Sequence, residues 1–289
     1  MKEKTDHRNA AHHSTGIFAL SPPFGRRMKR AFALLLLLIA ATSALAGVTY
    51  KVQSSTNGLR NVTIAGTVAV DGPRMRMDVT TGDNLLFKDN SIVLSGDGGK
   101  TMTVFDPATK TYYEIQLDQM IGAATAGLQS NPMFKVAFEN PTVAVRDEGD
   151  GEPIEGYRTH KSVLNASYDI AIDAMGQKIS SHLDMKTESW TTDQLSGELA
   201  NFLQQRGIRT GIAEIDKLID AQSGAVKGFP LKQVSTVKVN QGDSDVTMTT
   251  VATVSNIEKK DIAASQFVMP VGFTKVDDPV SKMMKAFQK

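Results

Sequence analysis

The stretch RMRMDV, residues 74–79, decides the fold class of this chain. Its apolar side chains fall on every second residue, and its charged side chains fall on the residues between them. Because successive side chains of a β-strand point to opposite faces, this period predicts a strand with one apolar face and one charged face. Such a strand is typical of an antiparallel sheet that has a core on one side and water on the other.

The same alternation recurs along the chain from residue 48 onward. It is found in Val62/Ile64/Val68/Val70, Phe134/Val136/Phe138, Tyr168/Ile170/Ile172, Ile179/Leu183/Met185, Val237/Val239 and Val246/Met248. Turn signals rich in Gly, Asp and Pro separate these runs, which predicts about nine to eleven strands. We expect five methionines to lie among Val and Ile on one concave, apolar side: Met75, Met77, Met102, Met185 and Met248.

Other segments follow the helical period instead. Apolar side chains recur every three or four residues over residues 116–128, 192–206 and 211–223, which predicts three inserted helices. A short fourth helix is predicted after Asp278-Pro279, in an amphipathic tail of residues 276–289. The pattern therefore predicts an α+β fold, predominantly antiparallel β, and it leaves open a barrel, a sandwich or a single curled sheet. No repeat or linker divides residues 47–275, so one domain is expected there.

Residues 28–46 are predicted to be a signal peptide. Lys29 and Arg30 precede an apolar stretch, and the residues up to Ala46 fit an Ala-x-Ala cleavage site. The stretch is shorter than the roughly 20 residues that a spanning helix needs, and Val48 stands where a lipidated Cys would have to follow. We therefore expect a periplasmic or secreted mature chain that is soluble, with no lipid anchor and no transmembrane anchor. Residues 1–27 are predicted to be disordered or wrongly assigned to the coding sequence.

Composition and motifs exclude several classes of function. The 289 residues include 32 basic and 31 acidic ones, a balance that does not favour a nucleic-acid partner. The absence of cysteine rules out thiol nucleophiles and Cys-ligated zinc. Beyond residue 46 the sequence has two histidines, His160 and His182, each in an alternating strand that lacks zinc-ligand spacing. We therefore expect no cofactor, no metal, no catalytic residue and no enzyme activity.

Short motifs in the C-terminal part carry a family resemblance. The stretch GFPLK at residues 228–232 enters a strand, and the stretch MPVGF at residues 269–273 follows the last strand pair. With GPRMRM at 72–77, KTYY at 110–113 and ESWT at 188–191, they make the chain resemble a family of uncharacterised secreted bacterial domains. That family is similar to the periplasmic carriers of outer-membrane lipoproteins (Lol-type). The resemblance implies a single curled sheet, an incomplete barrel covered by a few helices, with an apolar cavity for acyl chains.

Three functions remain open on these observations. The first is a non-catalytic binding module that holds a lipid or other amphiphile in an apolar cavity. The floor of that cavity is predicted to include Met75, Met77 and Val79, and its cover Leu117, Met120, Ile121, Leu199 and Phe202. The alternative is a structural or interaction protein of the cell envelope, with a filled core and a protein partner. A secreted hydrolase would require His160 or His182 to meet Ser and Asp in a polar cleft.

Overall fold

The computed structural model of the chain describes residues 47–116, 118–119, 122, 134–174, 177–195, 212–225, 227–241 and 244–282. In these residues twelve strands form one sheet, accompanied by the helix α4 (Ala213–Ala225) and the 3-10 helix η1 (Ala264–Phe267). The strands are β1 (Gly47–Asn57), β2 (Val62–Asp71), β3 (Arg74–Gly82), β4 (Ile92–Ser95), β5 (Thr101–Asp106), β6 (Thr111–Gln116), β7 (Phe134–Asp150), β8 (His160–Ala174), β9 (Gln177–Thr192), β10 (Phe229–Gln241), β11 (Ser244–Lys260) and β12 (Thr274–Lys275).

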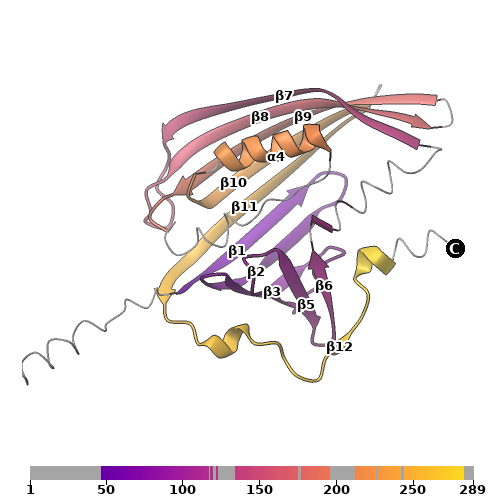
Figure 1. Cartoon of the computed structure of the whole chain (residues 1–289). Coiled ribbons are helices and arrows are strands. Elements are labelled where there is room, and N and C mark those ends of the chain that lie inside the picture. The colour runs from indigo at the N-terminus through magenta and orange to yellow at the C-terminus, as the bar shows by residue number, and fades with distance from the viewer. Residues whose placement is uncertain are drawn as a thin grey trace, which may run out of the picture. The chain divides into compact units, whose positions relative to one another are not determined.

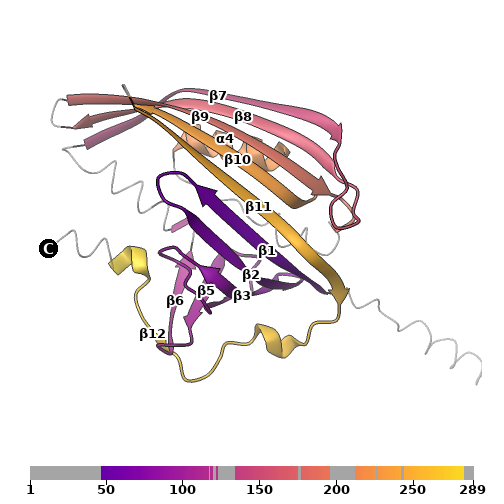
Figure 2. The ribbon, with the colours of Figure 1, turned by 180° about the vertical axis from the view of Figure 1, so that it is seen from behind.

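The sheet is built from two antiparallel meanders. Its strand order is β12-β6-β5-β4-β3-β2-β1-β11-β10-β9-β8-β7, so β1–β6 form one meander and β7–β11 the other. The pairing of β1 with β11 joins the two meanders, as Figures 1 and 2 show. The two-residue strand β12 lies parallel to β6, and all other pairs are antiparallel. The predominantly antiparallel α+β fold is therefore confirmed.

The sheet curls without closing, because its two edge strands, β7 and β12, do not pair with each other. Helix α4 packs against β7 and β8 and lies beneath the arch of β7–β10 (Figure 1). Of the architectures that the sequence pattern left open, the structure has the single curled sheet.

The predicted helices have different outcomes. Helix α4 confirms the helix expected over residues 211–223, and residues 279–282 are helical as expected after Asp278-Pro279. The Asp278 carboxylate accepts a hydrogen bond from the Ser281 backbone N–H at 2.9 Å, which caps that turn. The helix predicted over 192–206 begins too early, because Thr192 is the last residue of β9, where it pairs with Phe229. Residues 193–195 form a bend and a turn, so the prediction is wrong there too, and residues 196–206, like most of 116–128, lie outside the described residues.

The main core lies on one face of the β1–β6 meander. Its buried members come from all six of these strands and from three residues after β9, Leu195, Phe229 and Leu231. The ring of Tyr50 meets that of Phe229 edge-on at 5.4 Å, so the first and tenth strands are tied through aromatic packing. The loop between β7 and β8 adds Ile154 and Tyr157 to this cluster.

The C-terminal segment covers the opposite face of the same meander. The Val276 N–H donates to the Tyr112 carbonyl of β6, and the Thr274 N–H donates to the carbonyl of Lys110 just before β6, each at 2.9 Å. Phe273 packs edge-on against Phe105, whose side chain is completely buried. The expectation of a wet second face is therefore wrong for β4 and β5, because residues far along the chain lie over it.

Candidate functional site

The face of the sheet that carries Met75, Met77 and Val79 is called here the inner face. Strand pairing continues this face from β3 through β2 and β1 to β11, because Met77 is opposite Val68, which is opposite Tyr50. It then crosses β10, β9, β8 and β7 in a row of four residues: Val237, Met185, Ala166 and Val143. All five methionines expected on the concave side lie on this face.

The structure places the predicted cavity floor within or against the main core. Met75 is 7% exposed and Val79 is 2% exposed, and both belong to the buried cluster. Met77 is only partly buried and packs against that cluster. Its side chain lies across Gly66 of β2, where an added Cβ would come within 3.0 Å of the Met77 methyl carbon. Met77 is therefore the member of the predicted floor that remains partly accessible.

The predicted cover of the cavity falls outside the described residues. This applies to all five of its members: Leu117, Met120, Ile121, Leu199 and Phe202. Their contact with the floor stays a prediction.

The inner face of the long strands is apolar but much less buried. Leu164 and Ala166 of β8 form a small buried cluster, against which Tyr168 and Met185 pack. Around them Val143 is 38% exposed and Val145 is 48% exposed. Ile179 at the start of β9 is 42% exposed. Partial burial also raises the pKa of Tyr168, because its phenolate would lose solvation. An apolar surface thus continues from the core along β7–β11.

Sequence reasoning found part of this surface. The alternation in β8 and β9 predicted that Tyr168 and Met185 lie on an apolar face, and Met185 on its concave side, but neither is among the predicted cavity residues. Val143 and Val145 were missed, although they alternate with Thr142 and Ala144 at period two. This alternation was the sequence signal for an apolar strand face, and the charged stretch that follows it immediately obscured the pattern.

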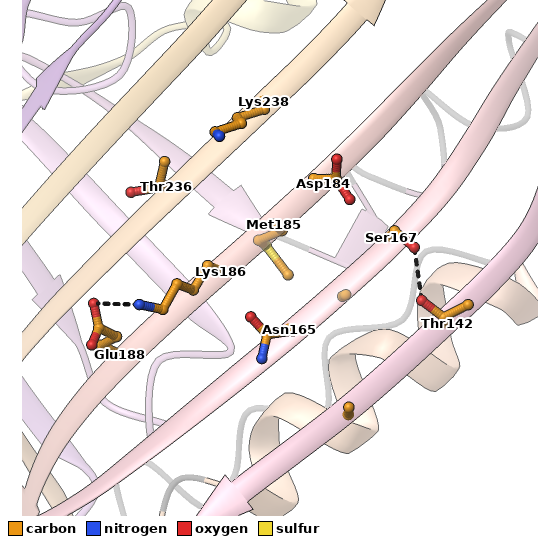
Figure 3. A pocket seen from close by; sticks show the side chains of 11 residues that line it. Thr142, Asn165, Ser167, Asp184, Met185, Lys186, Glu188, Thr236 and Lys238 are labelled. Atoms are coloured by element: carbon orange, nitrogen blue, oxygen red, sulfur yellow. Dashed lines mark hydrogen bonds and ion pairs between the residues drawn. The ribbon is translucent and has the colours of Figure 1, made fainter.

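The outer face of the same strands is polar. A depression of about 420 Å³ lies on this face. Figure 3 shows the side chains that line it, with α4 behind the strands. Its labelled side chains include Lys186, which pairs with Glu188 at 3.2 Å, and Thr142, whose hydroxyl lies 2.7 Å from that of Ser167. Ion pairs continue beyond the depression, with Lys161 between Glu148 at 2.9 Å and Glu188 at 3.1 Å. The two faces of β7–β10 therefore differ sharply in chemistry.

Residues 54–273 match the protein family described as "Domain of unknown function (DUF4412)". The chain belongs to this family. The match confirms the uncharacterised domain family that the short sequence motifs indicate.

Two solved structures are similar to the DUF4412 chain. A LolA superfamily protein from Nitrosomonas europaea is 9% identical, with a TM-score of 0.29, over 78% of this chain and 91% of that one. A putative outer membrane lipoprotein-sorting protein domain from Vibrio parahaemolyticus is 8% identical, with a TM-score of 0.28, over 83% of this chain and 96% of that one. A comparison with curated proteins finds no match.

The two histidines of the described DUF4412 structure lie at solvated positions. His160 Nε2 is 2.7 Å from the Asp147 carboxylate. His182 Nδ1 is 2.6 Å from Asp169, and its Nε2 is 3.4 Å from Asp184. The hydrogen bond to Asp169 raises the pKa of His182, and hydrogen bonds from Asn140 and His182 lower the pKa of Asp169. Both ring nitrogens of His182 thus face carboxylates, an arrangement that holds the ring on the outer face.

In the part of the DUF4412 chain that the structure describes, no three His, Asp or Glu side chains come together as metal ligands would. None of the helices in that part of the chain is long and apolar enough to cross a membrane.

Proposed function

We propose that this chain is a non-catalytic binding module, periplasmic or secreted, that holds a lipid or other amphiphile against the inner face of its curled sheet. One observation carries the proposal: the apolar inner face runs past the main core onto β7–β11, where side chains around the small buried cluster of Leu164 and Ala166 are only partly buried. Val145, with 48% of its surface exposed, is the clearest example. An apolar surface of this extent on a soluble domain is typical of a binding site.

The energetics of acyl-chain burial are adequate for such binding. Each buried CH₂ group contributes about 0.8 kcal/mol, so a chain of about 14 carbons gains about 11 kcal/mol on full burial. An association cost of about 4 kcal/mol leaves about 7 kcal/mol, which corresponds to a dissociation constant of about 10 µM. The partly exposed valines and the flexible Met185 side chain suit a ligand of variable shape.

The predicted floor fits this proposal with one adjustment. Met75 and Val79 are buried, so their part is to support the surface from within the core. Met77, at the border of the core, and the inner residues of β7–β11 are the ones proposed to touch the ligand. The predicted cover, Leu117, Met120, Ile121, Leu199 and Phe202, remains part of the proposal, because these side chains precede or follow the long strands in the chain.

The printed descriptions of the two similar solved structures agree with a role in the envelope, since both name the lipoprotein-sorting group or its superfamily. The signal-peptide pattern of residues 28–46 supports export. Cleavage after Ala46, release without a lipid anchor and the absence of catalysis belong to this proposal.

Native mass spectrometry of protein purified from its exporting host tests the proposal directly. We expect co-purified lipid, and titration with a fluorescent fatty acid is expected to give saturable binding. Val237→Glu places a charge on the inner face between Met185 and Met248, and it should weaken probe binding at least tenfold. Thr236→Glu, the neighbouring substitution on the outer face, is the matched control and should bind normally. Equal binding by both folded variants would refute an inner-face site.

A further inference from the structure

The two edges of the sheet differ in whether another segment of the chain pairs with them. At the β6 edge, β12 adds two paired residues, and the ammonium of Lys275 lies 2.6 Å from the Glu114 carboxylate. At the other edge of the sheet, β7 is 17 residues long, and none of the described strands pairs with the edge of β7 that faces away from β8. Unpaired N–H and C=O groups along such an edge are a direct template for another strand.

Irregular backbone confines the usable part of the β7 edge. Asn140 has a φ of 53°, and the register with β8 shifts between Glu139 and Thr142. The intervening Pro141 has no N–H to donate. The register shifts again between Asp147 and Gly149, where Gly149 has a φ of 77°. Between these two interruptions residues 142–146 pair regularly with β8 and offer a regular outer edge.

This regular edge is also where exposed apolar side chains gather on β7. Val143 and Val145 point to the inner face and are 38% and 48% exposed. Between them Ala144 points to the outer face, where its small side chain lines the depression. A native edge strand is usually protected by charge, by proline or by a bulge, and here Pro141 and both register shifts lie outside residues 142–146, so that Arg146, at the end of the segment, is its one charged residue.

We propose that residues 142–146 pair with the same residues of a second copy of this chain, antiparallel, in a register centred on Ala144. In this register Val143 of each copy is opposite Val145 of the other copy, and Thr142 of each copy is opposite Arg146 of the other. The two-fold axis is perpendicular to the sheet, so the inner faces of the two copies are continuous. The pairing is isologous, as in most homodimers.

The alternative registers are less favourable. A register centred on Val143 places Val145 opposite Pro141, which cannot donate a hydrogen bond. A register centred on Val145 places the Asp147 carboxylate opposite Val143. A register centred on Arg146 brings two guanidinium groups opposite each other, which is destabilising. The register on Ala144 alone pairs both valines with apolar partners and avoids like charges.

The contact is short, so the dimer should be weak. A five-residue strand pair buries less than the roughly 1,200 Å² that stable interfaces need. We therefore expect reversible association at concentrations of about 10 µM to about 500 µM. Reversible pairing would also keep the inner face open to a ligand, although the dimer does not depend on ligand binding.

The absence of cysteine makes a cross-linking test clean. In the proposed register, Ala144→Cys places two sulfhydryl groups across the new pair, within disulfide reach. Thr142→Cys is the matched control, since its two copies would be four residues apart along the strand, about 13 Å. Under mild oxidation the first variant should give a covalent dimer and the second should remain mostly monomeric. Equal cross-linking of the two variants, or none in Ala144→Cys, would overturn the register.

Sedimentation of the purified, uncross-linked protein tests association itself. The weight-average mass should rise toward twice that of one chain with increasing concentration. Val145→Lys should abolish this rise, because it places an ammonium opposite Val143 of the second copy. Val268→Lys, at a valine that is 62% exposed in the C-terminal segment, is the matched control and should still dimerise. Thermal unfolding of both variants confirms that they are folded. A wild-type chain that stays monomeric up to about 500 µM would refute the proposal.

Discussion

On the inner face of β1–β6, Val68, Val79 and Val104 are at most 4% exposed, whereas Val143 and Val145 of β7 are 38% and 48% exposed. The same alternation of side chains produces both surfaces. The first surface is buried because Phe229, Leu231 and Leu195, which lie far from β1–β6 in the sequence, pack against it. The second continues on strands of 13 to 17 residues that extend beyond this core. The comparison shows that alternation identifies an apolar face but not the segments that cover it.

The largest expected difference between the two regions is in tolerance to charge. Val79→Asp should prevent folding, because it buries an unpaired carboxylate in the main core. Met77→Asp, two residues away and only partly buried, should leave the protein folded and reduce fluorescent fatty-acid binding at least tenfold. Circular dichroism and probe titration measure the two effects. If Met77→Asp unfolds the protein and the wild type binds no probe, the inner face is ordinary core and the envelope-interaction alternative is favoured.

Truncation of apolar side chains should also affect the two regions differently, with a smaller difference in the free energy of unfolding. Leu231→Ala should lower the free energy of unfolding by about 2–5 kcal/mol, since Leu231 is fully buried in the main core. Met185→Ala removes a partly buried side chain beside Leu164 and Ala166, and its cost should be less than half as large. Urea denaturation of both variants gives the comparison. Similar losses would show that the long-strand region is packed as tightly as the core.

A titration in alkali should distinguish a partly buried tyrosine of the first region, Tyr113. Burial raises the pKa of Tyr113 to about 12, with a smaller effect from Asp106, and its hydroxyl donates to the Leu86 carbonyl. The stability that this group contributes is complete below its unfolded pKa of about 10, and it is lost as the pH rises through about 12. When the tyrosines are titrated in alkali and followed by phenolate absorbance, Tyr113→Phe should lack the component that titrates at the highest pH in the wild type. An unchanged titration curve would contradict the assignment.

The smallest expected effect lies on the outer face of the long strands. The hydrogen bond that His182 donates to Asp169 raises the pKa of His182, so the stability that it adds is present below pH about 6.5 and is lost as the pH rises through the raised value. Asp169→Asn should lower the pKa of His182, as measured by NMR titration of the imidazole. A His182 pKa that does not change would show that the ion pair is absent in solution.

The sequence by itself determined which side chains share a face. The period of two in residues 74–79 and in the later runs follows from strand geometry, so it assigned all five inner-face methionines correctly without knowledge of strand order. The helix near 211–223 followed in the same way from its period of 3.6. The count of nine to eleven strands missed β12, because two residues are too short to show any period.

Only the tertiary structure decided which strands are neighbours and which parts of the inner face are covered. The β1–β11 pair joins residues about 200 positions apart, and no local pattern records such a contact. The same applies to Phe105, which is buried by Phe273 on a face expected to be wet, and to Met75 and Val79, which are buried by residues that follow β9. Burial depends on what the rest of the chain places over a side chain, whereas alternation depends only on the strand that carries it.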